Sequence, residues 1–485
     1  MNDQALTDVR ESGAHREMDL TPAQRREQGV SLRKITPRSS HAEWAVRRDR
    51  PSPVAFLQAQ DVQRLAWLVP YRHQRMAESP FAFFRGSATI MAADLAGSPT
   101  SGLQSQICGD AHLANFGLFA SPERNLVFDI NDFDETLRGP WEWDIKRLAT
   151  SFVVAARHNG FDRRSLLEAV QASVRYYQRG MDRLASMPMI QVWHGHVRAN
   201  EIGHFFAQER RLGESQRREL GSRQAKVIGK ARAQDGYKAL SKIARQVDGH
   251  FRFKSQPPQI VPISELIPEN QPDQIRDAIL SSFDQYRTSL PDARRFLLDR
   301  YRLRDLALKV VGVGSVGTRC FVVLFEGREA QDPLLLQVKE ANASVLEAHL
   351  PPSPYDHHGQ RVVEGQRLMQ MASDVFLGWS RGVLGPHYYW RQFRDMKLSA
   401  PLESYRPRQM TNYAMLCGLT LAQAHARTGD AAAIAGYIGT SDTFVRALTT
   451  FAEAYADQND RDHAEFLDAL KSGAIASAET HQAQG

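Results

Sequence analysis

The sequence has few cysteines and no long apolar run. Its three cysteines, Cys108, Cys320 and Cys417, lie far apart and form no C-x-x-C pair, so we expect neither a zinc site nor a disulfide framework. Such cysteine usage suits a reducing compartment. The first residues hold no apolar signal-peptide core, and no window contains eighteen uninterrupted apolar residues. We therefore expect no signal peptide, no membrane span and a cytoplasmic protein.

A large excess of charge of one sign is also missing. The net charge of +6 over 485 residues favours anionic ligands such as nucleotide phosphates, although a basic solvated surface explains it equally well. We therefore expect no specific nucleic-acid binding. The apolar content of 42% lets a chain of this length bury a large core in two or three domains.

One acidic stretch, residues 108–144, gives the first indication of function. Asp110 is followed five residues later by Asn115, and Asp132 and Asp134 come at the end of a later predicted strand. Kinases place a substrate-facing carboxylate and two metal ligands around nucleotide phosphates with this kind of spacing. The stretch therefore predicts the catalytic and metal-binding centre of a phosphoryl-transfer fold.

The carboxylates of this stretch allow a second interpretation. A predicted hairpin, with strands at residues 116–120 and 126–130, returns them to the loop at Asp110. They could be turn and cap residues, where aspartate is common. Several carboxylates at one strand end repel one another unless a cation neutralises them, which favours a Mg²⁺ site. The cluster consists of Asp129, Asp132, Asp134, Glu135 and Asp144. Asp144 lies in the first turn of a helix that apolar spacing predicts over residues 143–159.

A glycine-rich run follows much later, at residues 310–325. Glycines in G-x-G-x-x-G spacing can open a Rossmann helix, cover ATP phosphates or make a simple turn. Here residues 319–325 continue as a strand rather than a helix, which favours the kinase type of loop over the dinucleotide type. The residues predicted to contact nucleotide phosphates are Gly312, Gly314, Ser315 and Gly317.

The next predicted strand ends in Lys339. A kinase needs such a lysine to hold the α and β phosphates, and an acidic partner on a nearby helix to position it. Glu364, in a predicted helix over residues 360–369, is the candidate partner, and Glu340 and Glu347 are nearer competitors. A sheet-edge charge is the alternative interpretation of Lys339.

The region before residue 100 carries a weaker signal. Residues 54–77 show helical spacing interrupted at Pro70, and residues 79–96 are rich in aromatics around Arg85. The simplest interpretation of Arg85 is a core helix entry. The alternative is that it reaches a phosphate or a substrate anion.

The order of these parts predicts a circular permutation, because the glycine loop and lysine follow the catalytic loop instead of preceding it. We expect an α+β, two-lobed protein-kinase-like fold with a large, mostly helical lobe and a small β-rich lobe. The predicted parts are a basic extension (1–50), a helical lobe with the catalytic loop and metal-binding hairpin (51–290), a β-rich nucleotide-binding lobe (291–400), helices that rejoin the helical lobe (401–471) and a loose tail (472–485).

Several stretches resemble a known bacterial family. CGDAHLANFG, VFDINDFDETLRGPWEWDIKRLA and KVVGVGSVGTRCFVVL closely resemble the domain-of-unknown-function family 2252, over about residues 35–465. That family carries over no established activity. The loop GDAHLAN is also similar to the H-G-D-x-H-x-x-N loop of aminoglycoside and choline phosphotransferases.

The second resemblance implies a role for each matching residue. These roles are a catalytic base for Asp110, a loop-structuring role for His112, magnesium ligation for Asn115 and Asp132, and bracing of the loop by Asp144. Two departures stand out. Cys108 replaces the leading histidine of the loop, and the hairpin after Asn115 is longer than usual. The longer hairpin leaves Asp129, and also Asp134, as rivals for the metal.

The sequence thus predicts an ATP- and Mg²⁺-dependent phosphotransferase acting on an unidentified hydroxyl acceptor. Its partners would be the nucleotide and that acceptor, which could be a small alcohol, an aminoglycoside-like sugar, a protein side chain or the protein itself. The alternative is a catalytically inactive, nucleotide-binding regulatory protein. An NAD-dependent oxidoreductase is disfavoured by the strand after Gly317.

Overall fold

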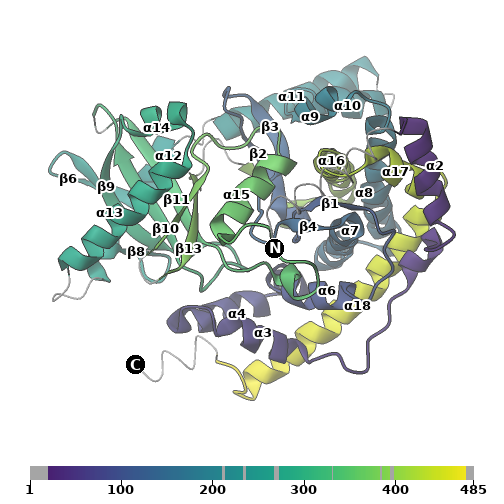
Figure 1. Ribbon diagram of the computed structural model, residues 1–485, viewed down its shortest axis with the longest axis horizontal. Coiled ribbons are helices and arrows are strands. Elements are labelled where there is room, and N and C mark those ends of the chain that lie inside the picture. Colours follow the sequence, from purple (N-terminus) through teal and green to yellow (C-terminus); the bar gives the residue numbers. More distant parts are fainter. Residues whose placement is uncertain are drawn as a thin grey trace, which may run out of the picture.

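The computed structural model describes residues 20–209, 213–232, 236–266, 272–329, 331–382, 385–393 and 398–476 (Figure 1). Helices make up 53% and strands 16%, and the strands form several antiparallel sheets. The predicted α+β class is therefore confirmed. Within those ranges, none of the helices combines the length and apolarity needed to cross a membrane.

A six-stranded antiparallel sheet forms one side of the molecule, at the left in Figure 1. Its first strand comes from before residue 291, where the predicted β-rich lobe begins. In chain order the strands are β8 (Ile260–Pro262), β9 (Arg302–Lys309), β10 (Cys320–Glu326), β11 (Pro333–Glu340), β12 (Gly378–Arg381) and β13 (His387–Gln392), and they lie side by side in the order β12-β13-β11-β10-β9-β8.

The two faces of this sheet differ because side chains alternate along each strand. One face packs Val323, Leu336 and Trp390 against Tyr286 of helix α13 (Pro272–Ser289). Lys339 pairs with Cys320 across β10 and β11 and points to the opposite face. The strands predicted after the glycine loop and at Lys339 are confirmed.

Helices build the other side of the molecule, at the right in Figure 1. Ile145, Leu148 and Phe152 of α7 are fully buried at helical spacing. The helix predicted at residues 143–159 is confirmed with a slightly earlier start. The main helices of this side are α7 (Trp141–His158), α8 (Arg163–Leu184), α16 (Pro407–Ala426), α17 (Ala431–Ile438) and α18 (Thr443–Lys471).

The described part of the predicted N-terminal extension lies on this helical side. Helix α2 (Pro22–Leu32) packs against α17. Arg33 and Arg38 donate hydrogen bonds to the carbonyls of Tyr437 and Ile438, at 2.9 and 2.7 Å. Cations thus satisfy carbonyls at the C-terminal end of α17. The first 19 residues of the predicted extension, and residues 477–485 of the predicted tail, lie outside the described residues.

Four short helices follow: α3 (Pro53–Asp61), α4 (Val69–Ala77), α5 (Pro80–Gly86) and α6 (Ala88–Leu95). The interruption predicted at Pro70 instead falls at residues 62–65, before a short 3-10 turn. Pro70 lies in the first turn of α4, where a missing amide hydrogen costs nothing.

Two smaller sheets and a helix connect the sides. β1 (Gln104–Ile107) pairs with β4 (Leu137–Pro140), and the predicted hairpin is confirmed as β2 (Phe116–Ala120) and β3 (Leu126–Ile130), with β5 (Val197–Arg198) and β14 (Leu398–Ser399) at its edges. Helix α15 (His358–Met369) lies between the large sheet and the helices (Figure 1). The remaining described elements include α9 (Met189–His194), α10 (Ile202–Glu209), α11 (Glu214–Arg232), α12 (Gly236–Ile243), α14 (Asp292–Leu298), β6 (Ala244–Val247) and β7 (His250–Phe253).

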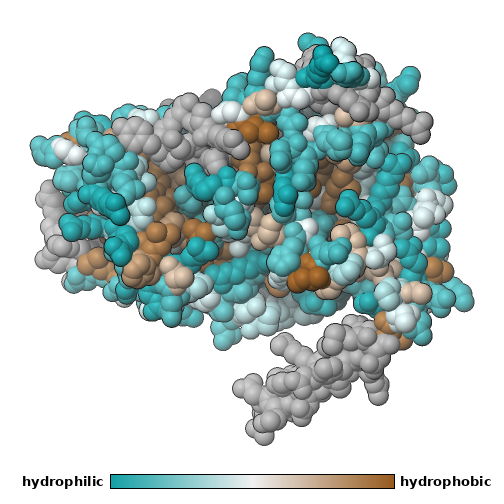
Figure 2. All heavy atoms as spheres, turned by 90° about the horizontal axis from the view of Figure 1, so that it is seen from above, coloured by the Kyte–Doolittle hydropathy of each residue, from teal (hydrophilic) through white to brown (hydrophobic). Residues whose placement is uncertain are grey.

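The face drawn in Figure 2 is mostly hydrophilic, and its apolar residues appear in several separate areas between polar side chains. Single apolar residues and small apolar areas of this kind are normal on a protein surface.

Candidate functional site

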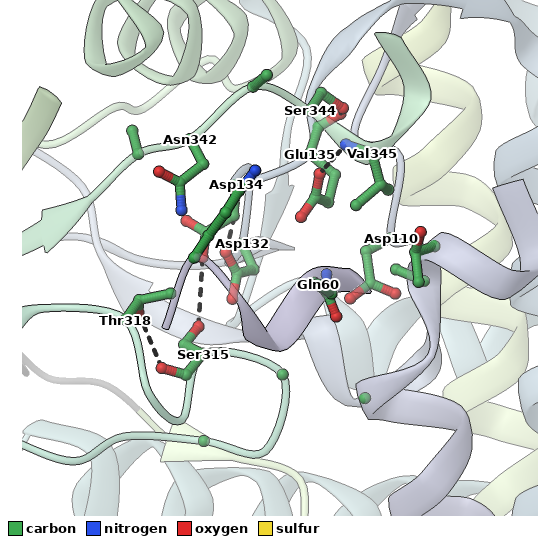
Figure 3. A pocket seen from close by; sticks show the side chains of 18 of the residues that line it. Gln60, Asp110, Asp132, Asp134, Glu135, Ser315, Thr318, Asn342, Ser344 and Val345 are labelled. Atoms are coloured by element: carbon green, nitrogen blue, oxygen red, sulfur yellow. Dashed lines mark hydrogen bonds between the residues drawn. The ribbon is translucent and has the colours of Figure 1, made fainter. Parts of the chain in front are cut away.

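A cavity of about 590 Å³ lies where the two sides of the molecule meet. Its wall combines residues from the acidic stretch, the glycine loop, the segment after β11 and helices α3, α5 and α6. Figure 3 shows Asp110, Asp132, Asp134 and Glu135 around this space together with Gln60, and a dashed line joins Ser315 to Asp134. Of the predicted site residues, those that line it are Asp110, His112, Asn115, Asp132, Asp134, Gly312, Gly314 and Ser315.

Strand pairing brings the acidic residues together. Ile107 at the end of β1 pairs with Leu137 at the start of β4, and the Thr136 hydroxyl donates to the Ile107 carbonyl at 2.7 Å. The residues that follow β1 and those that precede β4 therefore lie side by side. The β2–β3 hairpin does the same for Asn115, whose carbonyl accepts from the Asn131 amide at 2.7 Å.

Gly109 allows the closest approach between these loops. It has φ +78°, and a Cβ atom there would lie 2.5 Å from the Glu135 carbonyl oxygen. Only glycine avoids both the strained conformation and the clash. Asp144, at the start of α7, accepts hydrogen bonds from the Cys108 and Gly109 amides at 2.8 and 2.9 Å. These are the contacts predicted for an aspartate that braces the loop.

Asp110 is held in an ion pair. Its Oδ1 accepts a hydrogen bond from Arg147 Nε, and His112 Nε2 lies 3.7 Å from its Oδ2. Burial raises the pKa of Asp110, although Arg147 opposes the rise. Burial also lowers the pKa of His112 well below its ordinary value, helped by Arg85 and Arg147. His112 is therefore a neutral imidazole beside a carboxylate.

Asn115 and Asp132 have oxygens that remain available to a cation. The Asn115 amide nitrogen donates to the Asp110 carbonyl at 2.8 Å, which leaves its side-chain oxygen for other partners. Asp132 Oδ1 has only long contacts, 3.4 Å to the Asp134 amide and 3.9 Å to Lys339 Nζ. Burial and the neighbouring Asp134 carboxylate raise the pKa of Asp132. A nearby cation would relieve this repulsion.

Within the described part of the chain, no three His, Cys, Asp or Glu side chains are arranged to hold a metal ion by themselves. Mg²⁺ usually binds through one or two carboxylates, with waters and substrate phosphates completing its shell. Asn115 and Asp132 fit that mode of binding, in which the protein supplies only part of the shell.

The carboxylate of Asp134 is bound by side chains from the large sheet. Lys339 Nζ lies 2.5 Å from its Oδ2, the Tyr389 hydroxyl donates to its Oδ1 at 2.6 Å, and Ser315 Oγ lies 3.3 Å away. Burial alone would raise the pKa of Asp134, but Lys339 and these hydrogen bonds lower it to about 2. The ion pair joins residues 205 positions apart in the sequence. Lys339 thus lies at the carboxylate cluster, and its partner is Asp134 instead of the predicted Glu364.

The glycine loop, residues 310–319, connects β9 to β10 and is fastened to the N-terminal helices. Gly312 and Gly317 adopt φ +66° and +93°, which favour glycine. The carbonyl of Gly312 accepts from Arg75 at 2.6 Å, and that of Gly317 accepts from the Leu65 amide at 2.7 Å. Gly312, Gly314 and Ser315 line the cavity, whereas Gly317 contacts Arg64 behind it.

Two predicted site residues lie elsewhere. Glu364 does not pair with Lys339: it pairs with Arg367 at 2.8 Å, one helical turn along α15. The counter-charge of Lys339 is the Asp134 carboxylate instead of Glu364. Asp129 lies within β3 and is not in the cavity wall, because its side chain accepts from the Ile130 amide and is close to Arg427. Burial raises the pKa of Asp129 to about 7.

Sequence reasoning missed two arginines. Arg147 is one turn after Asp144 on α7, and this spacing on a helix face could have identified it. Arg361 of α15 is buried and donates to the carbonyls of Thr136, Asp134 and Asn342 at 2.7, 2.8 and 2.9 Å. Its place directly before Val362 and Val363, which are also buried, was the available signal.

The fold and this site define an α+β protein in which an acidic loop and a glycine loop share one cavity. The chain belongs to the family of uncharacterized proteins conserved in bacteria, DUF2252, whose model matches residues 64–469. The match starts later than the sequence resemblance suggested. No curated protein and no solved structure matches the chain.

Proposed function

We propose that the protein is an ATP- and Mg²⁺-dependent phosphotransferase with a circularly permuted, kinase-like fold. The observation that carries the proposal is the shared cavity. Asp110, Asn115 and Asp132 enter it from the first third of the chain, and Gly312 to Ser315 enter it from about 180 residues further along the chain.

The order of elements in the large sheet supports this proposal. The glycine loop joins β9 to β10, Lys339 lies on β11, and α15 follows before β12 and β13. Kinases use a glycine loop, a lysine on the third strand and a following helix to hold nucleotide phosphates. A triphosphate lying under Gly312 to Ser315 would have Asp110 at one end and, at the other, Asp134, whose partner Lys339 is buried behind the cavity wall.

Each residue then has a defined task. Asp110 orients the acceptor hydroxyl and takes its proton, and its raised pKa brings it closer to the range of an effective base. Asn115 and Asp132 would hold Mg²⁺, which supplies charge neutralisation for the phosphates. Lys339 would reach phosphate oxygens only by giving up part of its ion pair with Asp134, which separates it from the cavity. Arg361 fixes the backbone that carries Asp134.

One observation favours the second candidate, a nucleotide-binding protein that transfers nothing. The guanidinium of Arg147 holds Asp110 in an ion pair, and a carboxylate engaged in this way is a weaker base. The two candidates predict the same nucleotide binding and differ only in turnover.

Calorimetric titration with ATP and ADP, with and without Mg²⁺, tests the binding. We expect ATP to bind in a Mg²⁺-dependent way, and we expect Asp132→Asn to abolish that dependence. Asp129→Asn is the matched control, because Asp129 lies three residues earlier and outside the cavity wall. Absence of ATP binding, with or without Mg²⁺, would overturn the proposal.

ATP turnover, with water or a panel of hydroxyl compounds as acceptor, separates the two candidates. For a phosphotransferase, Asp110→Asn should retain ATP binding and lose roughly 10²- to 10⁴-fold in turnover. Nucleotide binding without turnover in the wild-type protein would instead support the regulatory candidate.

A further inference from the structure

The wall of the cavity beside the acidic loop contains a cation that has no partner among the described residues. Among the described residues that line the cavity, the arginines are Arg64 and Arg85. Arg64 donates to the Val316 carbonyl and lies 3.7 Å from Asp61. Arg85 forms no hydrogen bond or ion pair through its guanidinium with any described residue, and its Nε is buried. Among the described residues, the Phe81 ring lies beside it, with its centroid 5.9 Å from the guanidinium carbon.

The position of Arg85 is fixed by its backbone. It lies in the last turn of α5, where the preceding carbonyl, that of Phe84, accepts from Arg147 Nη2 at 2.9 Å. Its own carbonyl faces the glycine loop, since a Cβ atom on Gly314 would lie 3.2 Å from it. Arg147 donates a second hydrogen bond to the Asp110 carboxylate. Arg85 therefore lies between the glycine loop and Asp110.

A partly buried guanidinium without a partner is costly, because it gives up water without gaining a replacement. Four carboxylates act on Arg85 electrostatically, and among the described residues none forms an ion pair with it; in decreasing order of effect they are Asp110, Glu403, Glu78 and Asp132. The planar guanidinium offers a fork of donors that matches a phosphate or carboxylate group. A ligand oxyanion is the partner that the cavity can admit.

We infer that Arg85 binds an oxyanion, a phosphate or carboxylate group of the ligand, beside Asp110. That Arg85 binds an oxyanion does not depend on the proposed function, but which molecule supplies the oxyanion does. In a phosphotransferase it would be either the terminal phosphate of the nucleotide or an acidic group on the acceptor. If it belongs to the acceptor, the acceptor is an anionic hydroxyl compound.

Titration of the full-length protein with inorganic phosphate and pyrophosphate tests the inference. We expect binding by the wild-type protein and at least tenfold weaker binding by Arg85→Gln. Arg85→Lys should give an intermediate loss, because it keeps the charge but not the fork. Arg163→Gln is the matched control, since Arg163 is an exposed residue on α8 paired with Glu453, and it should bind like the wild type.

A second titration identifies the source of the oxyanion. Phosphate is added to protein saturated with ADP and Mg²⁺, or with a non-hydrolysable ATP analogue and Mg²⁺. If phosphate binds with ADP but not with the ATP analogue, Arg85 holds the terminal phosphate of the nucleotide. If phosphate binds in both cases and still requires Arg85, the oxyanion belongs to the acceptor.

The possible failures are distinguishable. Equal phosphate affinity in the wild type and Arg85→Gln, or no phosphate binding by the wild type, overturns the inference and leaves ATP binding to be judged separately. Arg85-dependent phosphate binding without any ATP binding keeps the oxyanion site and removes the proposed function. Circular dichroism of each variant establishes that it is folded, and Arg85→Lys provides the test if Arg85→Gln does not fold.

Discussion

Two buried ionic clusters in this molecule use the same residue types in different ways. The first, the Arg50 cluster, lies among the helices and contains Arg50, Asp94 and Asp462. Arg50 donates two hydrogen bonds to each aspartate, at 2.6 to 2.9 Å. Tyr455 and Gln458 donate to the same carboxylates, at 2.7 Å each. All four carboxylate oxygens have a close partner.

The second, the Lys339 cluster, lies at the cavity and contains Lys339, Asp132 and Asp134. Lys339 approaches Asp134 at 2.5 Å but Asp132 only at 3.9 Å. Asp134 has a further donor in Tyr389, whereas Asp132 has no close donor among the described residues. One carboxylate of this cluster is satisfied and the other is not.

The difference separates a structural role from a functional one. A closed cluster such as that of Arg50 gains specificity by satisfying every oxygen, and no lining residue of the large cavity belongs to it. An open cluster keeps an unsatisfied carboxylate facing a cavity at a cost in stability, which is common where a ligand completes the site. The following predictions test this contrast.

The largest expected effect is on folding stability in the Arg50 cluster. Arg50→Leu should lower the free energy of unfolding by about 3–5 kcal/mol, because it leaves two buried carboxylates without a counter-charge. Urea denaturation followed by circular dichroism measures the change. Arg157→Leu serves as the control. Arg157 pairs with Asp457 and Asp460 at the surface, so the control should cost roughly 1 kcal/mol or less. Equal losses in the two variants would contradict the contrast.

A smaller effect, of opposite sign, is expected at the cavity. Asp132→Asn should leave stability unchanged or raise it by about 1 kcal/mol, because it removes an under-satisfied carboxylate beside Asp134. Asp94→Asn should instead cost about 2–3 kcal/mol, since Arg50 and Tyr455 lose a charged acceptor. The same denaturation measurement compares the pair. If Asp132→Asn is the more destabilising variant, the Lys339 cluster is structural.

Sequence alone supplied the parts of this site but not all of their pairings. Local pattern was enough for the β2–β3 hairpin, helix α7 with Asp144, and the strand that carries Lys339. The partner of Lys339 could not be read, because it depends on how α15 turns about its axis. That rotation places Arg361 against the acidic loop, and it places Glu364 where its carboxylate pairs with Arg367.

Asp129 and Arg85 are two further residues whose surroundings could not be predicted from the sequence. Alternation along β3 decides which carboxylates reach the cavity, and that depends on the exact residue at which the strand ends. Arg85 became informative only when the structure left its guanidinium without a partner in the described chain. A single arginine in a sequence carries no such signal. The missing information was therefore tertiary: which side chains meet, and which do not.

The smallest expected effect concerns helix α15, which holds the open cluster in place through Arg361. The first amides of α15 are capped by two imidazoles: His357 Nδ1 accepts from the Gln360 amide at 3.2 Å, and His387 Nδ1 accepts from the His358 amide at 3.0 Å. The two capping rings stack, with centroids 4.1 Å apart. Both caps require neutral rings, because a protonated nitrogen cannot accept a hydrogen bond.

Burial, His387 and Arg381 lower the pKa of His357 to about 4. Burial and Arg381 also lower the pKa of His387. Burial and Arg361 lower that of the adjacent His358, and Glu347 opposes this. The unfolded chain therefore takes up protons on these rings before the folded chain does. The stability that the neutral rings contribute is present above about pH 6.5 and is lost as the pH falls toward 4.

His357→Asn should remove part of this acid sensitivity. Asparagine caps a helix N-terminus without titrating, so the variant should match the wild type at pH 7.5 and be more stable than it at pH 4.5, by about 1 kcal/mol. Urea denaturation at the two pH values measures the difference in the free energy of unfolding. The contributions of the other titrating groups cancel because these groups are common to both proteins. His196→Asn, at a histidine whose ring contacts a carbonyl two residues away, is the matched control. A stability difference that is the same at both pH values would show that His357 acts only by packing, and that the backbone of Asp134 is held independently of protonation at the start of α15.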